Sequence, residues 1–100
     1  MKNKSIKKEI DGFVKICNEI IELKKKKAND YGNSWRAFGI KGLYYQLGRK
    51  FARIWLNKDN SNFKNESLRD SLIDNAVYSL MAIQLLDEND TEDKIDEILK

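Results

Sequence analysis

The sequence predicts an all-α fold: a compact bundle of three long helices plus a short C-terminal helix, within a single domain spanning residues 1–100. Proline is absent from the chain, and apolar residues recur at spacings of three and four, the period of an amphipathic helix. Hydrophobic residues make up 41% and charged residues 35% of the chain, a balance typical of a folded domain. One hundred residues suffice for one domain with one core.

The first helix is expected over about 5–28 and ends in a basic turn, Lys24–Lys27, which a helix C-terminus favours. Its apolar stripe consists of Ile6, Ile10, Phe13, Cys17 and Ile20. The second helix is expected over about 41–57, and two glycines near its start, Gly39 and Gly42, are expected to loosen the chain. Asn65 is predicted to cap a third helix over about 66–86.

The last helix is short, and its apolar side is formed by Ile95, Ile98 and Leu99. We expect these side chains to be exposed in a single chain. Together with a distant family resemblance named below, they favour a homodimer as the state in solution.

The residue types exclude several classes of chemistry. The chain has no histidine, so His-based zinc sites, Ser-His-Asp triads and imidazole acid–base catalysis are excluded. A metal-dependent reaction would use Mg²⁺ or Mn²⁺ on carboxylate oxygens. The single cysteine, Cys17, indicates a reducing compartment and is interpreted as a small core residue. No membrane span or signal core is recognisable, and we expect a cytoplasmic protein.

The charge pattern argues against a dedicated nucleic-acid binder. The formal net charge is only +3, and such binders carry more positive charge on one face. A role of the first helix and its Lys24–Lys27 turn in DNA binding is the lowest ranked of the three functional hypotheses.

An acidic stripe opens the third helix. Glu66, Asp70 and Asp74 follow one another at intervals of four residues, so they lie on one side of the helix, and Val77 and Met81 continue that side. In a structural interpretation Glu66 complements the helix dipole, while Asp70 and Asp74 pair with two cations of the second helix, Lys50 and Arg53. In a functional interpretation the three acids bind Mg²⁺, which in turn holds substrate phosphates. The sequence leaves both open.

A second unusual cluster is Asp30-Tyr31-Gly32-Asn33-Ser34-Trp35. Structurally, Tyr31 and Trp35 would close one end of the bundle around a turn at Gly32. Functionally, Tyr31 or Trp35 would stack on a base, with Asp30 or Asn33 contacting polar edges of the base or sugar. A further acid pair, Glu19 and Glu22 on the first helix, is most simply a surface pair.

These residues resemble a known family. The segment 27–35, Lys-Ala-Asn-Asp-Tyr-Gly-Asn-Ser-Trp, is similar to the K-x-x-D-Y-G-x-S-W signature of the nucleotide modification associated domain, type 1. The resemblance continues through Gly42-Leu43, Lys50-x-x-Arg53-Ile54 and Glu66-Ser67-x-x-Asp70-x-x-x-Asp74-x-x-x-Tyr78 and covers about 20–86. It implies a role in phage or bacterial nucleotide metabolism.

The layout is similar, more distantly, to the MazG-like and dimeric dUTPase group of all-α nucleoside triphosphate pyrophosphatases. That resemblance implies Mg²⁺ on paired acidic motifs, cleavage between the α- and β-phosphates, and oligomers. The spacing here, Glu66-x-x-x-Asp70, is one residue longer than the group's E-x-x-D, and the preceding helix carries Lys50 and Arg53 where the group has acids. Nucleotide binding without hydrolysis therefore stays open beside catalysis.

The leading hypothesis is binding of a nucleoside phosphate, with Mg²⁺-dependent pyrophosphohydrolysis as its enzymatic form. Glu66, Asp70 and Asp74 would be the metal ligands and catalytic residues. The substrate would be bound by Asp30, Tyr31, Asn33, Trp35, Lys50 and Arg53. The alternative is a small non-enzymatic interaction domain of phage type that binds a host protein, with the same acids in structural roles.

Overall fold

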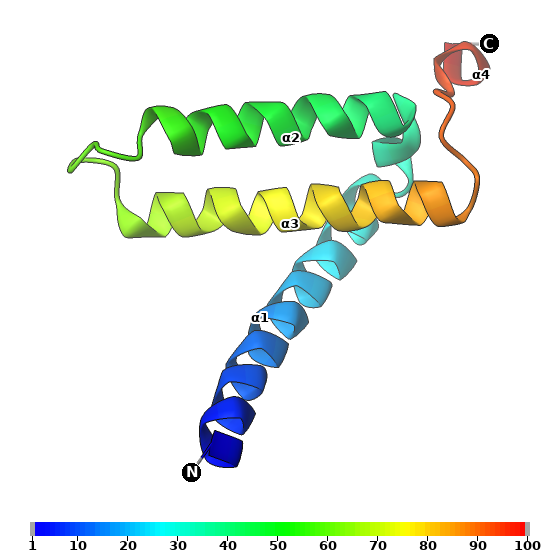
Figure 1. Cartoon of the computed structure of the whole chain (residues 1–100). Coiled ribbons are helices and arrows are strands. Elements are labelled where there is room, and N and C mark those ends of the chain that lie inside the picture. The colour runs from blue at the N-terminus through cyan, green and yellow to red at the C-terminus, as the bar shows by residue number, and fades with distance from the viewer. Residues whose placement is uncertain (1, 100) are drawn as a thin grey trace. The chain divides into compact units, whose positions relative to one another are not determined.

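The computed structural model describes residues 2–99, apart from the side chains of five of them, Lys2, Tyr31, Asn65, Ile98 and Leu99. Residues 2–99 contain helices and turns but no strand, which confirms the all-α class with three long helices and a short fourth. The elements are α1 (Lys2–Tyr31), a 3₁₀ turn η1 (Ser34–Arg36), α2 (Gly39–Leu56), α3 (Asn65–Asp87) and α4 (Ile95–Leu99) (Figure 1).

The contacts divide the chain into two units, Met1–Gly32 and Asn33–Lys100. The first consists of α1, and the second holds η1, α2, α3 and α4. That residues 1–100 form a single domain stays a prediction.

The first unit is a helix of 30 residues, which at 1.5 Å per residue is about 45 Å long. It extends a few residues beyond both predicted ends because no helix breaker interrupts the chain before Gly32, whose φ is +61°. Three members of its apolar stripe, Ile6, Ile10 and Phe13, are more than half exposed.

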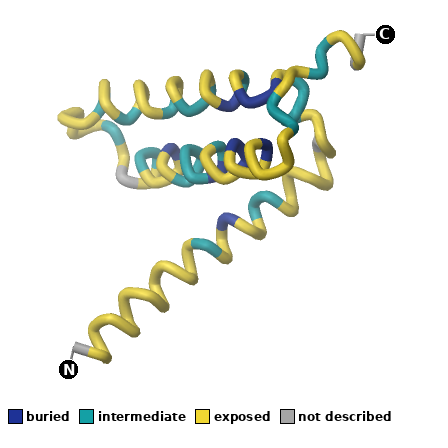
Figure 2. The backbone as a smooth tube through the Cα atoms, turned by 45° about the vertical axis from the view of Figure 1, so that its right-hand side comes forward, coloured by how far each residue is buried: buried dark blue, intermediate teal, exposed yellow. Residues whose placement is uncertain are grey.

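The second unit is built on a helical hairpin, in which α2 and α3 lie side by side and run in opposite directions (Figures 1 and 2). On each helix, positions alternating by three and four residues form the packed side, as in a left-handed helix pair. On α2 and its C-cap residue these positions are Ile40, Leu43, Leu47, Lys50, Ile54 and Asn57, and on α3 they are Ser67, Ser71, Asp74, Tyr78, Met81 and Leu85. All twelve are at least partly buried.

The apolar core of this unit occupies the half of the hairpin where α2 begins and α3 ends, shown in dark blue in Figure 2. Its buried side chains are Ile40, Leu43, Val77, Met81, Ala82 and Leu85. Leu85 is the most completely buried of them, at 1% exposure. The other half of the hairpin is polar along its packed side, and this asymmetry positions the candidate site.

The loop after α3 is fastened to the start of α2 by two backbone hydrogen bonds. The amide of Ile40 donates to the carbonyl of Thr91 over 3.0 Å, and the amide of Lys94 donates to the carbonyl of Ala37 over 2.7 Å. Gly39 makes this approach possible, because its φ is +66° and a Cβ atom there would lie 2.5 Å from the Thr91 oxygen.

Two predictions about local structure are wrong. Lys64, with extended backbone, is the N-cap residue of α3, and Asn65 is the first helical residue. The rest of the predicted third helix agrees within one residue at each end. Gly42 does not loosen the chain either, since it lies inside α2 with its Cα against the side chain of Phe38.

Candidate functional site

A lysine and an aspartate face each other across the hairpin. The Nζ atom of Lys50 on α2 lies 3.0 Å from Oδ2 of Asp74 on α3, and the two side chains are 23% and 28% exposed. Both occupy packed positions where an apolar side chain would give more stability. This pairing matches one part of the structural interpretation made from sequence.

Polar groups continue on α3 beside this pair. Ser71, one turn before Asn75, is buried, and its hydroxyl donates to the carbonyl of Ser67 over 3.0 Å. The Oδ1 atom of Asn75 is buried and has no hydrogen-bond partner among the described residues. A buried amide oxygen without a donor is uncommon in native proteins and destabilises the fold. The middle of the hairpin therefore contains a buried hydrogen-bond acceptor that no described residue satisfies.

Arg53 lies one turn beyond Lys50 on α2 but does not join the pair. Its guanidinium carbon lies 5.6 Å from the centre of the Phe63 ring, which comes from the linker between α2 and α3. The side-chain amide of Asn57 donates to the backbone carbonyl of Arg53 over 2.8 Å. Arg53 is exposed, so its guanidinium donors are accessible to an anion from solvent.

The acidic stripe is divided by the fold. Glu66 lies in the first turn of α3, where a carboxylate favours the helix dipole, and both Glu66 and Asp70 are exposed. Only Asp74 reaches a cation of α2 through a described ion pair. Within the described residues, no three Asp, Glu, Cys or His side chains gather closely enough to hold a metal ion. The assignment of Mg²⁺ to these three acids stays a prediction.

The predicted base-binding cluster spans the boundary between the two units. Asp30 is an exposed residue of the last turn of α1, and the side chain of Tyr31 lies outside the described residues. Asn33 is exposed and directly precedes η1. Trp35, within η1, is half-buried, and the guanidinium carbon of Arg36 lies 4.5 Å from the centre of its ring. Trp35 comes before the start of α2, and Lys50 lies eleven residues, or about 16 Å, beyond that start.

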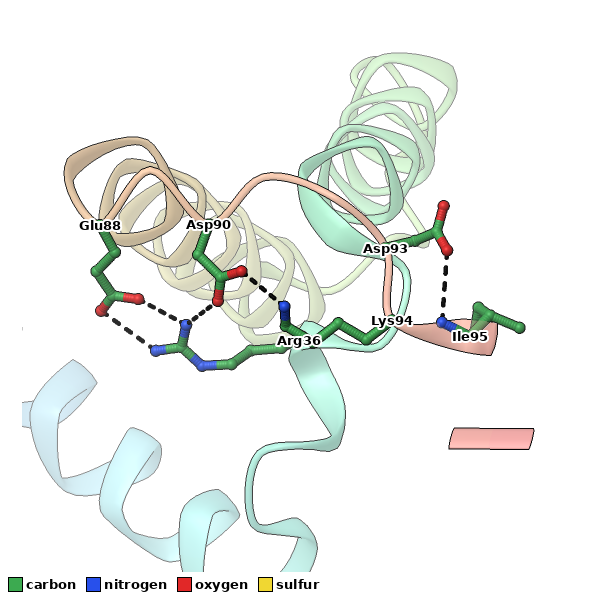
Figure 3. Close-up of polar contacts among 6 residues, drawn as sticks. All are labelled: Arg36, Glu88, Asp90, Asp93, Lys94 and Ile95. Atoms are coloured by element: carbon green, nitrogen blue, oxygen red, sulfur yellow. Dashed lines mark hydrogen bonds and ion pairs between the residues drawn. The ribbon is translucent and has the colours of Figure 1, made fainter. Parts of the chain in front are cut away.

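An ion-pair cluster holds η1 against the end of α3 (Figure 3). Arg36 donates to both carboxylate oxygens of Glu88, over 2.6 and 3.3 Å, and to Asp90 over 3.2 Å. Lys94 adds a second cation, 2.8 Å from Asp90. The cluster therefore fixes the backbone that carries Trp35.

These contacts shift the acid–base equilibria of all four groups. The hydrogen bonds from Arg36 lower the pKa of Glu88, and the hydrogen bond from Lys94, followed by those from Arg36, lowers the pKa of Asp90. In return, Glu88 raises the pKa of Arg36 and Asp90 raises that of Lys94. Water reaches every member of the cluster, so each ion pair contributes only modestly to stability.

One member of the acid pair of α1 contacts a lysine of the same helix. Glu22 accepts a hydrogen bond from Lys25 over 3.2 Å, and both side chains are mostly exposed. Cys17 is a free, half-buried thiol. Among the described helices, none is long and apolar enough to cross a membrane.

The comparison with protein families decides where this chain belongs. Residues 27–86 match the model of nucleotide modification associated domain 1, which is more than half of the chain. The chain belongs to this family. No curated protein and no solved structure matched the chain.

The family match covers η1, α2 and nearly all of α3, together with every substrate- and metal-binding residue predicted from sequence. It leaves out most of α1, and with it Glu19 and Glu22. The match therefore associates this chain with nucleotide modification. The more distant MazG-like relationship is not shown by the match.

Three residues of the site escaped the sequence-based prediction. In the sequence, Arg36 draws less attention than its neighbour Trp35, although an arginine next to an aromatic residue is a common stacking pair. Phe63 is the only aromatic residue between 57 and 65, which marks it as a residue with a packing role. Asn75 carries no signal in the sequence, since its burial depends on how α3 turns toward α2.

Proposed function

We propose that this domain binds a nucleoside phosphate at the polar middle of the α2–α3 hairpin, with the phosphate on Lys50 and Arg53. One observation carries the proposal: the Lys50 ammonium is held at a packed position by Asp74, 3.0 Å away, with three quarters of its side chain out of water. A paired charge at such a position rarely adds stability compared with apolar packing. Its presence in a nucleotide-associated family is better explained by ligand binding.

The two cations suit different parts of a phosphate group. Lys50 acts as a compact charge already positioned by the hairpin, and Arg53 presents planar donors at its exposed end. A phosphate oxygen can replace the Asp74 carboxylate as the partner of Lys50. Asp74 is then available to a second ligand.

Mg²⁺ is the second ligand in this proposal. Magnesium is commonly held by one or two carboxylates together with substrate phosphates, so a cluster of three acids is not needed. Asp70 and Asp74 lie one turn apart on α3, with Glu66 one turn further. Bound Mg²⁺ would neutralise phosphate charge and lower the pKa of a coordinated water.

Hydrolysis is the enzymatic form of the proposal. A water molecule would attack the α-phosphorus of a nucleoside triphosphate, and pyrophosphate would leave with the electron pair of the broken P–O bond. Asp70 and Asp74, with Glu66 beside them, would orient the metal and accept the proton from water. The products are a nucleoside monophosphate and pyrophosphate.

The base is assigned to Trp35, with Asp30, Tyr31 and Asn33 as its neighbours in sequence. Arg36 supports this assignment, because its contacts with Glu88 and Asp90 restrain the backbone next to the Trp35 ring. Lys50 lies about 16 Å beyond the start of α2, and Trp35 comes before that start, so one ligand contacts both only if it extends along α2. Otherwise, the base-binding residues belong to a second copy of the chain.

The test is calorimetric titration of the full chain with nucleoside mono-, di- and triphosphates, with and without Mg²⁺. We expect Lys50→Met to weaken binding at least about tenfold, while Lys41→Gln, an exposed cation on the same helix, leaves it unchanged. Circular dichroism establishes that each variant is folded. Equal affinities in the wild type and Lys50→Met, or no binding to the folded wild type, would overturn the proposal.

A second candidate function is protein binding, as expected for a phage-type interaction domain. The observation in its favour is the exposed aromatic surface of α2, where Tyr44, Phe51 and Trp55 are each more than half exposed. Phe51 and Trp55 stack with ring centres 6.1 Å apart, and Lys58 covers the Trp55 ring. A flat nucleotide titration combined with a host-protein complex lost in Phe51→Ser would favour this function.

A further inference from the structure

The 3₁₀ turn η1, which carries Trp35, has little within itself to hold it in place. It is three residues long, contains no buried residue, and its N-cap residue Asn33 makes no side-chain capping hydrogen bond. A single turn of this kind is marginal by itself, because few hydrogen bonds offset the ordering of its backbone. The position of η1 is therefore set by contacts outside the turn.

Arg36 supplies a group of these contacts through one guanidinium. Its donors engage both carboxylate oxygens of Glu88, over 2.6 and 3.3 Å, and one oxygen of Asp90 over 3.2 Å (Figure 3). The guanidinium carbon also lies 4.5 Å from the centre of the Trp35 ring. One group of η1 therefore contacts the tryptophan ring and the end of α3 at the same time.

The end of α3 presents both carboxylates to Arg36. Asn89 has a φ of +54°, in the left-handed region, and the amide of Asp90 donates to the carbonyl of Leu85 over 2.9 Å. This hydrogen bond and the left-handed residue form a helix C-cap that turns the chain away from the helix axis. Glu88 and Asp90 lie on either side of the turning residue, and both reach Arg36.

The charges of the cluster favour a positioning role over anion binding. Arg36 and Lys94 contribute two positive formal charges, and Glu88 and Asp90 contribute two negative ones, so the cluster has no net charge. A phosphate that approached Arg36 would meet two carboxylates already bound there, and like charges repel. The cluster is therefore suited to hold a neighbouring side chain and poorly suited to attract a phosphate.

We propose that Arg36 is a positioning residue of the base-binding site, with segment 88–94 as its support. The proposal rests on the proposed function, because it concerns Trp35 as the residue that stacks on the base. Segment 88–94 is also hydrogen-bonded to Ala37 and Ile40, directly after η1. This segment lies beyond the family match, which ends at residue 86, so base recognition depends on a part of the chain that the family model does not cover.

Calorimetric titration of the full chain with a nucleoside triphosphate and with tripolyphosphate separates the base from the phosphates. Arg36→Gln should weaken nucleoside triphosphate binding by about tenfold, because stacking on a loosely held ring loses part of its energy to ordering that ring. The affinity for tripolyphosphate, which has no base, should stay within about twofold of the wild-type value. Equal losses for the two ligands would overturn the proposal.

Lys58→Gln is the matched control for this titration. It removes a cation that lies 4.5 Å from the centre of the other tryptophan ring, Trp55. Neither affinity should change in this variant, because Trp55 is not assigned to the base. A loss of nucleoside triphosphate affinity equal to that of Arg36→Gln would overturn the assignment to Arg36.

The carboxylates test whether Arg36 acts through its partners. Glu88→Ala combined with Asp90→Ala should reproduce the tenfold loss of nucleoside triphosphate affinity, and adding Arg36→Gln should cause little further loss, since residues of one network are not additive. If Arg36 instead bound the phosphates, removing the carboxylates would free its donors and raise the affinity for tripolyphosphate. Such an increase, or full additivity in the triple variant, would overturn the positioning role.

Fluorescence provides a readout that needs no ligand. The chain has two tryptophans, so Trp55→Phe leaves Trp35 as the sole tryptophan emitter. In that background Arg36→Gln should lower the residual anisotropy of Trp35 on the nanosecond timescale, with the helical circular dichroism unchanged. An unchanged anisotropy would overturn the proposal even if nucleotides bind. A folded wild-type chain that binds neither phosphate ligand would instead overturn the proposed function, and the positioning role with it.

Discussion

The ammonium of Lys50 and the carboxylate of Asp74 meet at 3.0 Å between α2 and α3, at positions that the helix period assigns to the packed side. The pair separates the apolar half of the hairpin from its polar half. Replacing such a partly buried ion pair by apolar residues is often neutral or stabilising, so stability alone does not account for the pair. The proposed role of Lys50 as a phosphate-binding residue, oriented by Asp74, is consistent with this position.

The first prediction concerns the stability of the pair. Asp74→Asn should lower the free energy of unfolding by about 1–2 kcal/mol, because the partly buried Lys50 loses its partner while water still reaches it. Lys50→Met combined with Asp74→Leu should be neutral or stabilising. Urea denaturation followed by circular dichroism measures both.

The double variant should also lose nucleotide binding, which separates the function of the pair from its contribution to folding. A double variant that is much less stable than Asp74→Asn would indicate that the two charges support the fold through further contacts.

The second prediction concerns two glycines of α2. Gly39→Ala should destabilise the protein by about 2 kcal/mol or more, because its φ is +66° and a Cβ atom would press on the Thr91 carbonyl. Gly48→Ala should stabilise it by about 0.5–1 kcal/mol, since its site is helical and open. Thermal melting compares the two. Similar melting temperatures for both variants would contradict the tight junction between α2 and the loop after α3.

The helices could be predicted because their signals are local. Apolar spacing located α2 and α3 within about two residues, and the absence of proline left the helices uninterrupted. The start of α3 was misjudged by one residue because Asn65 resembles a cap in sequence, while the extended backbone at Lys64 depends on the linker before it.

The site was predicted in part because its geometry is not local. One-turn spacing correctly placed Glu66, Asp70 and Asp74 on one helix, but it could not say that only Asp74 would meet a cation of α2. Trp35 and Lys50 are separated by most of α2, a consequence of helix length rather than of motif order. Arg36, Glu88 and Asp90 converge from positions more than 50 residues apart, which no spacing rule finds.

The third prediction concerns stability at acid pH. Glu88 and Asp90 have lowered pKa values in the folded protein, so the unfolded chain binds more protons in the acid range. Their stabilisation is therefore complete above the ordinary carboxyl pKa values near about 4 and is lost as the pH falls through the lowered values. Arg36→Gln should flatten this acid transition, as measured by thermal melting between pH 2 and 7.

The Lys94–Asp90 contact has the opposite limit. The raised pKa of Lys94 means that its contribution is complete at neutral pH and is lost only as the pH rises through that raised value. Lys94→Gln should leave the alkaline limb flatter than in the wild type.

An acid transition as steep in Arg36→Gln as in the wild type would show that other carboxylates control it.

The fourth prediction separates the metal hypothesis from a structural role of Asp70. This side chain is exposed, so Asp70→Asn should change the free energy of unfolding by less than about 0.5 kcal/mol. The same variant should abolish the Mg²⁺-dependent part of nucleotide binding in calorimetric titrations. An unchanged affinity with Mg²⁺ would exclude Asp70 as a ligand.

The last prediction concerns the buried oxygen of Asn75, which has no partner among the described residues. Asn75→Leu should stabilise the protein by about 1 kcal/mol, because it removes a desolvated acceptor and keeps a side chain with the same branched shape. Asn57→Leu is the matched control: it removes a donor to the Arg53 carbonyl and should destabilise by about 0.5–1 kcal/mol. If Asn75→Leu also weakens nucleotide binding, the amide is retained for the ligand at the expense of stability. A loss of stability would instead mean that the oxygen has a partner in solution, and Asn75 would then belong to the fold rather than to the site.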